Sequence, residues 1–407
     1  MRLALRLGLV LLLLCPVQPL AGQGKPFKRA LVLTGGGFKF LYFVGMYDAL
    51  MDSGWVPDVI ISTCGASVAM AIIHGEPDRG RRLELIQSAA MLEGIRGFRL
   101  ERGGFRDIER LLRHISRYRT AWETGNDVLP DLHSLAFYDD DPPNLPGWGR
   151  PFTDRAPGAP HLLILGATAD LSPDEVGKPR AGRKVYHEAF FTDPEVAAHL
   201  TGLSSSIAQR FPGSAVGGPT RVFTDVPVGD AALISIRDPF LFKPVRRGDT
   251  WFTGANINLY PLELARHLAD EVMMTFNTGF NDFELLAIRV SLGYDMNARL
   301  REVTAAPVDR WIDATLAGVK RFAMDPRMHY GFPTLFELRP TLPRDEQIGA
   351  EWPYVVSAEA EFTRRALAAY DWGYTRAWEA AHMVPTGSTA HVRGRTRHNF
   401  GGDAPPP

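Results

Sequence analysis

The chain has 407 residues, of which 45% are hydrophobic and 22% charged, and its 45 basic and 46 acidic residues give a net charge of −1. This composition indicates a globular protein with one large domain or two smaller ones, and it excludes a disordered or fibrous chain. Because there is no basic excess, a nucleic-acid partner is not expected.

The residue types also give no reason to expect a metal centre or a cofactor. Cys15 and Cys64 are the two cysteines, which is too few for a disulfide framework or a cysteine-based zinc site. The 11 histidines are scattered, without an HExxH pair. We therefore predict neither a transition metal nor a bound cofactor.

The first 22 residues have the pattern of a secretory signal peptide. Arg2 and Arg6 precede an apolar run, residues 7–14, that is too short to span a bilayer. Prolines and small residues follow, so we expect cleavage near Ala21 and export to the periplasm or the exterior. An uncleaved anchor is the alternative. Cleavage would leave Cys64 as the one thiol of the exported chain.

Alternating short apolar runs and helical periodicity then predict an α/β layered domain with a mainly parallel sheet. Hydrophobic spacing and turn residues place a strand at 30–34, a helix at 41–50, a strand at 58–63 and a helix at 68–73. Further strands are expected at 161–166, 184–189, 222–228 and 283–292, and helices at 262–276, 310–322 and 358–381.

Two segments interrupt or follow this pattern. Residues 79–122 have apolar positions at helical spacing, and residues 138–160 are dense in Pro, Gly and Asp. We interpret the second as an irregular surface connector, with a cover over a site as the alternative. The tail at 385–407 lacks apolar periodicity and is expected to be disordered.

Three successive glycines, Gly35, Gly36 and Gly37, stand between the first strand and the first helix. Backbone N–H groups at such a turn can hold an anion or a developing oxyanion. A dinucleotide fingerprint would need a further glycine where Phe40 stands, and Asp58 opens the second strand instead of following it. A P-loop is excluded because no Gly-Lys-Ser/Thr follows.

The order of motifs resembles the patatin-like phospholipases. Their pattern is strand, G-G-G-x-R-G, helix, strand, a nucleophile elbow G-x-S-x-G, and far downstream D-G-G or D-G-A before an N-x-P segment. Residues 35–40 match the first motif in their glycines, with Lys39 at the arginine position. Aligned without a gap, the elbow falls on residues 62–66 (STCGA), and the last motif on residues 253–255 (TGA). The resemblance covers roughly residues 30–264.

The resemblance implies a site in which the two catalytic positions are substituted. In the family, a serine attacks the acyl carbonyl and an aspartate is the general base. The glycine turn stabilises the oxyanion, and the arginine at the position of Lys39 is expected to bind the substrate. Here Cys64 stands at the serine position and Thr253 at the aspartate position. A threonine hydroxyl cannot accept a proton near neutral pH as a carboxylate can, so the family's base is missing.

Cys64 and Ser67 are the alternative nucleophiles. A thiol at a strand-to-helix turn is reactive because the helix N-terminus lowers its pKa from about 8.5. The competing interpretation of Cys64 is a small apolar filler. Ser67 would require a longer strand, and we interpret it as a cap of the helix N-terminus.

No base can be identified from the sequence. His74 lies ten residues into the predicted helix, about 15 Å from Cys64 along its axis. Asp238, before Pro239, and Asp249 are interpreted as loop or turn residues.

The resemblance implies a patatin-like three-layer fold, and the residue patterns add a helical insertion and a C-terminal helical extension. We expect a signal peptide at 1–22, a main domain at 28–295 with an insertion at about 79–160, an extension at 296–384 and a tail at 385–407. The implied function is handling of lipid acyl esters, with impaired hydrolysis, peripheral membrane contact as a possibility, and no cofactor. The alternatives are an active hydrolase using Cys64 or Ser67, a non-catalytic lipid-binding protein and, outside this class, a nucleotide-dependent oxidoreductase, which the missing glycine disfavours.

Overall fold

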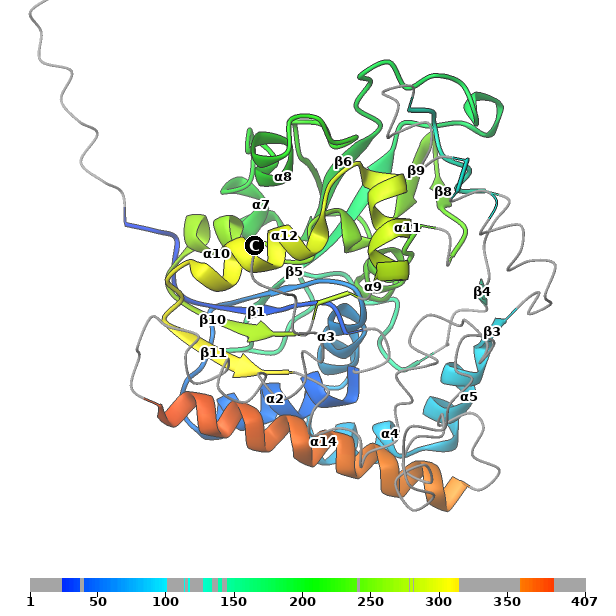
Figure 1. The fold of residues 1–407 in the computed structure, drawn as a ribbon. Coiled ribbons are helices and arrows are strands. Elements are labelled where there is room, and N and C mark those ends of the chain that lie inside the picture. The colour runs from blue at the N-terminus through cyan, green and yellow to red at the C-terminus, as the bar shows by residue number, and fades with distance from the viewer. Residues whose placement is uncertain are drawn as a thin grey trace, which may run out of the picture.

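A mixed, mostly parallel β-sheet forms the centre of an α/β fold in the computed structural model (Figure 1). The structure describes residues 24–36, 40–100, 113, 116–117, 127–133, 138–140, 145–239, 242–277, 279–280, 282–314 and 359–383. The sheet has the strand order β11-β10-β1-β2-β5-β6-β7, with β9 paired to β5 and β8 to β9. Its strands are β1 (Phe27–Leu33), β2 (Val59–Ser62), β5 (His161–Ala169), β6 (Tyr186–Thr192), β7 (Arg221–Phe223), β8 (Val245–Arg247), β9 (Thr250–Thr253), β10 (Ala269–Phe276) and β11 (Arg310–Asp313).

The direction of the strands decides where a site can form. All pairings from β11 through β5 are parallel, whereas β6 and β9 run antiparallel to β5. Every residue of β2 and β5 is buried, as expected for central strands covered on both faces. The loops that follow β1 and β2 therefore leave the same carboxyl edge of the sheet, where ligands of open parallel sheets bind.

Helices lie on both faces of this sheet. In Figure 1, α10 (Leu262–Leu268) lies above β1 and β10, while α2 (Phe40–Asp52) and the long α14 (Glu359–His382) lie below. The remaining helices are α3 (Gly65–Gly75), α4 (Arg79–Ile86), α5 (Ala89–Gly97), α7 (Pro194–Ala198), α8 (Ser206–Arg210), α9 (Val228–Ser235), α11 (Asp282–Leu292) and α12 (Met296–Ala305), with short 3₁₀ turns η1 (Pro173–Glu175) and η2 (Ala255–Ile257). A separate two-stranded sheet pairs β3 (Phe98–Leu100) with β4 (Tyr138–Asp140). None of the helices in the described ranges combines the length and apolar character needed to cross a membrane.

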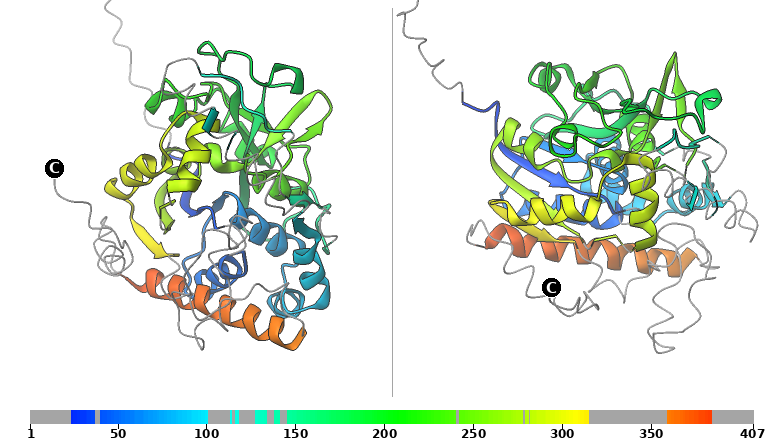
Figure 2. Two further views of the ribbon diagram at one scale, coloured as in Figure 1. Left: turned by 45° about the vertical axis from the view of Figure 1, so that its right-hand side comes forward. Right: turned by 45° about the horizontal axis from the view of Figure 1, so that its top comes forward.

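Helix α14 packs closely on α2. Figure 2 shows α14, in orange, along one side of the fold. A Cβ atom on Gly45 would lie 2.0 Å from the carbonyl oxygen of Tyr370, and one on Gly373 would lie 2.0 Å from that of Tyr42. The two backbones can approach to this distance only because both positions lack a side chain. The C-terminal helix is therefore part of the main packing unit.

Buried charges add a second connection between these helices and α4. Arg82 and Asp48 form an ion pair in which both side chains are 3% exposed, and Arg82 also donates to the carbonyl oxygens of Glu76 and Pro77. The other oxygen of Asp48 accepts a hydrogen bond of 2.7 Å from the Tyr370 hydroxyl. Asp48 thus joins three helices that are far apart in sequence.

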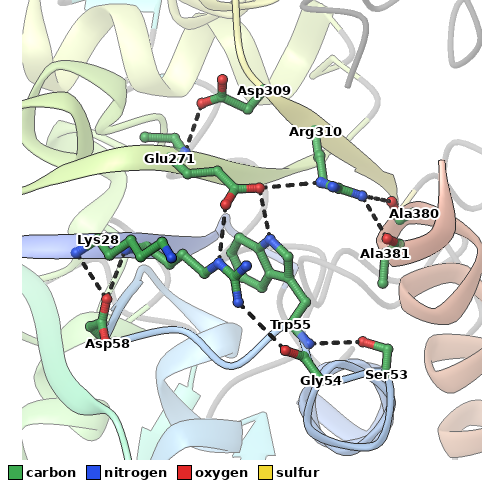
Figure 3. Close-up of polar contacts among 12 residues, drawn as sticks. Lys28, Ser53, Gly54, Trp55, Asp58, Glu271, Asp309, Arg310, Ala380 and Ala381 are labelled. Atoms are coloured by element: carbon green, nitrogen blue, oxygen red, sulfur yellow. Dashed lines mark hydrogen bonds and ion pairs between the residues drawn. The ribbon is translucent and has the colours of Figure 1, made fainter. Parts of the chain in front are cut away.

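A polar cluster at the amino edge of the sheet fixes the end of α14 (Figure 3). Glu271 accepts from Arg29 at 3.0 Å, from the Trp55 indole at 2.9 Å and from Arg310 at 3.3 Å. Burial alone would raise the pKa of Glu271, but the hydrogen bonds from Trp55 and Arg29 outweigh it and lower the pKa. Arg310 in turn donates to carbonyl oxygens at the C-terminus of α14, including that of Ala381 at 2.5 Å.

The structure confirms the predicted strands at 30–34, 58–63 and 161–166 and the long C-terminal helix. Three predicted assignments are wrong: 283–292 is helical, and 269–276 and 310–313 are strands. The expected connector begins with the short strand β4, and its described residues 145–160 are irregular as predicted. The predicted signal peptide and tail, and most of 101–126, lie outside the described residues. The predicted domain boundaries remain predictions.

Candidate active site

Cys64 occupies the turn between β2 and α3, where its backbone has φ 53° and ψ −131°. Residues other than glycine avoid positive φ because the Cβ atom meets the backbone, so this conformation is strained. A strained strand-to-helix turn of this kind presents a nucleophile above the edge of a sheet in hydrolases with an elbow motif. The Cys64 side chain is buried to 7% exposure, and it lies at the N-terminus of an eleven-residue helix.

Three serine hydroxyls form a buried hydrogen-bond network at this turn. The Cys64 N–H donates to Ser235 Oγ at 2.8 Å, and Ser67 Oγ donates to the same oxygen at 3.0 Å. Ser67 Oγ also lies 3.1 Å from Ser62 Oγ. The structure therefore does not give Ser67 the capping role that the sequence suggested: Cys64 occupies the cap position, without a side-chain cap, and Ser67 is fully buried in the network.

The glycine turn after β1 lies against the first turn of α3. Gly35 and Gly36 both have positive φ, of 57° and 108°. The Gly35 N–H donates to Thr63 Oγ1 at 2.8 Å, and the Gly35 carbonyl accepts from Ala66 N–H at 3.2 Å. Gly35 is therefore used for positioning. The predicted contributors Gly37 and Lys39 lie outside the described residues.

Two backbone N–H groups at this turn have no hydrogen-bond acceptor within the described part of the chain, those of Gly36 and Gly65. Gly65 directly follows Cys64, and in hydrolases with an elbow the residue after the nucleophile contributes to the oxyanion hole. Sequence reasoning assigned the oxyanion to the three glycines alone and missed Gly65. The positive end of the α3 dipole adds to the attraction of a negative oxygen here.

Thr253 lies at the end of β9 and is 2% exposed. Its hydroxyl donates to the carbonyl oxygen of Arg237 at 2.8 Å, and the N–H of Gly254 donates to the same oxygen at 2.6 Å. Arg237 follows Ser235 by two residues, so the end of α9 contacts both the Cys64 turn and the distal motif. The structure thus brings the two motifs to one segment, with Thr253 acting as a donor.

The residues considered as a base lie in different environments. His74 contacts the Pro151 carbonyl at 2.9 Å at the far end of α3, where burial lowers the pKa of His74. Asp249 is fully exposed and pairs with Arg246 at 3.1 Å. Asp238 lies in a loop, as expected from the sequence, but its Oδ1 atom is buried, and burial raises the pKa of Asp238 to about 7. No pattern in the sequence indicated that this carboxyl group is buried.

A histidine and two carboxylates elsewhere come close enough to share an ion. Potential ligand atoms of His161, Asp193 and Glu195 lie within 4.8 Å of one another. However, Asp193 accepts from His161 at 2.7 Å and from the N–H groups of Glu195 and Val196, which begin α7. These contacts account for the cluster as a helix cap, and we assign no metal to it.

Comparison with known proteins adds little detail to this site. No family model matches the chain, and no curated protein matches it. Among solved structures, VipD from Legionella pneumophila is similar over 86% of this chain and 67% of its own, with 14% identity and a TM-score of 0.29. The type III effector protein ExoU is similar over 84% of this chain and 54% of its own, with 14% identity and a TM-score of 0.25. The similarity is distant and concerns the fold.

Proposed function

We propose that this chain is a patatin-like protein that binds lipid acyl esters at the Cys64 turn and hydrolyses them slowly through the Cys64 thiol. The main support is the backbone of Cys64, which is held at φ 53° between a buried strand and the N-terminus of α3. Strain of this kind costs about 1–3 kcal/mol and persists where surrounding contacts enforce it, which is typical of functional positions. An apolar filler would not need a strained backbone.

The neighbouring groups suit an acyl-transfer reaction. In the proposed step, the ester carbonyl oxygen accepts hydrogen bonds from the N–H groups of Gly36 and Gly65 while the sulfur bonds to the carbonyl carbon. The ester C–O bond then breaks and the alcohol leaves with a proton. Water hydrolyses the resulting thioester and restores the thiol of Cys64.

The slow rate follows from Thr253. A general base contributes about 10²–10⁴-fold to such reactions, and the Thr253 hydroxyl both lacks a suitable pKa and already donates to Arg237. Export and a lipid partner, expected from the sequence, belong to the same proposal. Binding without turnover is the second candidate, which the donor role of Thr253 favours.

The test combines acyl trapping with turnover. Purified protein is incubated with p-nitrophenyl butyrate and p-nitrophenyl palmitate, and the acyl adduct is located by peptide mass spectrometry. We expect an adduct on Cys64 and slow nitrophenol release, both lost in Cys64→Ala. Ser67→Ala serves as the comparison, since it removes a neighbouring hydroxyl and should leave the adduct in place. Turnover that survives in Cys64→Ala would contradict the proposal, and bound ester without any adduct would favour the binding protein.

A further inference from the structure

Asp238 is a buried acid that no described neighbour neutralises. Its Oδ1 atom has lost contact with solvent and has no hydrogen-bond partner among the described residues, although part of the residue reaches the surface. Burial is the sole cause of its raised pKa, of about 7, which means that neither a cation nor a donor offsets the loss of water. Unpartnered buried carboxyl groups destabilise a fold and therefore concentrate at functional sites.

Its place in the chain connects Asp238 to both motifs of the candidate site. Ser235, which accepts from the Cys64 N–H, precedes it by three residues, a span of at most about 10 Å. The segment also turns tightly, because the Asp238 N–H donates to the Ile236 carbonyl at 2.8 Å. On the other side, a Cβ atom on Gly254 would lie 2.8 Å from the Asp238 nitrogen, next to Thr253.

The charged groups around this segment have other partners. On its own segment, Arg237 donates to the Lys243 carbonyl at 2.7 Å. On α9, Asp230 pairs with Arg247 at 2.5 Å, and on the β8–β9 turn Asp249 pairs with Arg246. Helix α3 carries one titratable ring, His74, at the end far from Cys64. Among the described residues of these segments, Asp238 is thus the acid whose carboxyl group has no such partner.

We propose that the carboxylate of Asp238 takes the proton of the Cys64 thiol and so serves as a less effective substitute for the base that is missing at position 253. This inference rests on the proposed function. As the sulfur bonds to the ester carbonyl carbon, the thiol proton moves to Asp238, directly or through one water molecule. When the ester C–O bond breaks, Asp238 returns that proton to the alcohol oxygen. In the second half, Asp238 accepts a proton from the attacking water, the C–S bond breaks, and the sulfur regains the proton.

The arrangement explains why the distal motif can use a threonine. A carboxylate at position 253 could accept a proton, whereas the Thr253 hydroxyl donates to the carbonyl oxygen of Arg237. That bond holds the residue immediately before Asp238. Thr253 is thus a positioning residue, and the proposed proton acceptor, Asp238, lies on the segment that Thr253 holds in place.

The experiment compares Asp238→Asn, which keeps the shape and removes the acid, with Asp249→Asn, a matched loss of an exposed carboxylate. Hydrolysis of p-nitrophenyl butyrate and alkylation of Cys64 by iodoacetamide are each measured from about pH 5 to 9, around the group's raised pKa. We expect Asp238→Asn to lower kcat at least about 10²-fold and to remove its rise near neutral pH. We also expect Cys64 alkylation to shift to lower pH, because a thiolate is easier to form without a neighbouring negative charge.

The two readouts separate failure of the inference from failure of the proposed function. Turnover that depends on Cys64 but is unchanged in Asp238→Asn would keep the function and overturn the inference. An alkylation shift in a protein without ester turnover would reject the proposed function while supporting the Asp238–Cys64 pairing. An unshifted alkylation profile, or the same shift in Asp249→Asn, would overturn the inference whatever the turnover.

Discussion

Thr253 donates its hydroxyl hydrogen bond to the carbonyl oxygen of Arg237, at 2.8 Å and away from solvent. This donor role is the opposite of the acceptor role that the sequence resemblance implies for position 253. A carbonyl oxygen can only accept, so the position now requires a donor. An ionised aspartate at position 253 would therefore place an acceptor against an acceptor.

We predict that Thr253→Asp destabilises the protein above neutral pH and does not raise ester turnover. The buried carboxylate would face the Arg237 carbonyl without a hydrogen, at a cost of about 1–3 kcal/mol in the free energy of unfolding. Its folded-state pKa would be raised, so the stability is present at low pH, where the acid can donate, and is lost as pH rises through that pKa. Denaturant unfolding at several pH values measures this.

Thr253→Asn is the control for that substitution, because its amide can donate at any pH. It should show no pH-dependent loss relative to the unsubstituted chain. If the aspartate and asparagine variants unfold at the same denaturant concentration above neutral pH, the bond to Arg237 does not determine which residue fits at 253.

The backbone of Cys64 gives a second prediction. Glycine adopts positive φ without a steric penalty, whereas alanine carries the same penalty as cysteine. Cys64→Gly should therefore be more stable than Cys64→Ala. We expect a difference of about 1–2 kcal/mol after allowing for the greater entropy of glycine in the unfolded chain. Both variants lose the thiol, so thiol contacts cancel in the comparison. Equal unfolding free energies would mean that the turn relaxes and stores no strain.

The crossing of α2 and α14 gives a third prediction. Gly45→Ala would place a methyl group 2.0 Å from the carbonyl oxygen of Tyr370, so α2 and α14 would have to move apart. We expect a loss of at least about 1–3 kcal/mol in the free energy of unfolding, together with faster hydrogen exchange in α14. Gly213→Ala is the matched control, since no atom lies within 4 Å of its Cβ position. Similar losses in both variants would contradict the close crossing.

The carboxyl edge of the sheet could be predicted from the sequence because its signals are local. The apolar run of β1, the glycines after it and the turn after β2 are contiguous, and the structure places Cys64 at that turn. Residues 269–276 could not be assigned in this way. Their strand is covered on both faces, so it lacks the alternation of a half-exposed strand and continues the helical spacing of α10.

The opposite error occurred at 283–292, where isoleucine and valine favoured a strand. Leu285, Ile288 and Leu292 are buried there at the spacing of one helix face. For the site, Ser235 and Asp238 could not be found from sequence because their roles arise from packing. Ser235 meets Cys64 across 171 residues, and an aspartate before a proline is most often a turn residue.

A fourth prediction concerns Glu188, a second buried acid, which is 3% exposed. Burial raises the pKa of Glu188 to about 7, although hydrogen bonds from Ser205 at 2.8 Å and Asn258 at 3.1 Å oppose the shift. In the unfolded chain the Glu188 carboxyl group ionises near its ordinary pKa of about 4.3. Its contribution to the stability of the fold is therefore fully present below that pH and is lost as pH rises to about 7.

Glu188→Gln keeps an oxygen that accepts from both donors and removes the ionisation. We therefore expect the variant to match the unsubstituted chain in acid and to exceed it above neutral pH, by an amount on the order of 3 kcal/mol. Denaturant midpoints measured across this pH range test the prediction, and a glutamine variant that is less stable than the unsubstituted chain at every pH would show that the charged form is the one the fold requires.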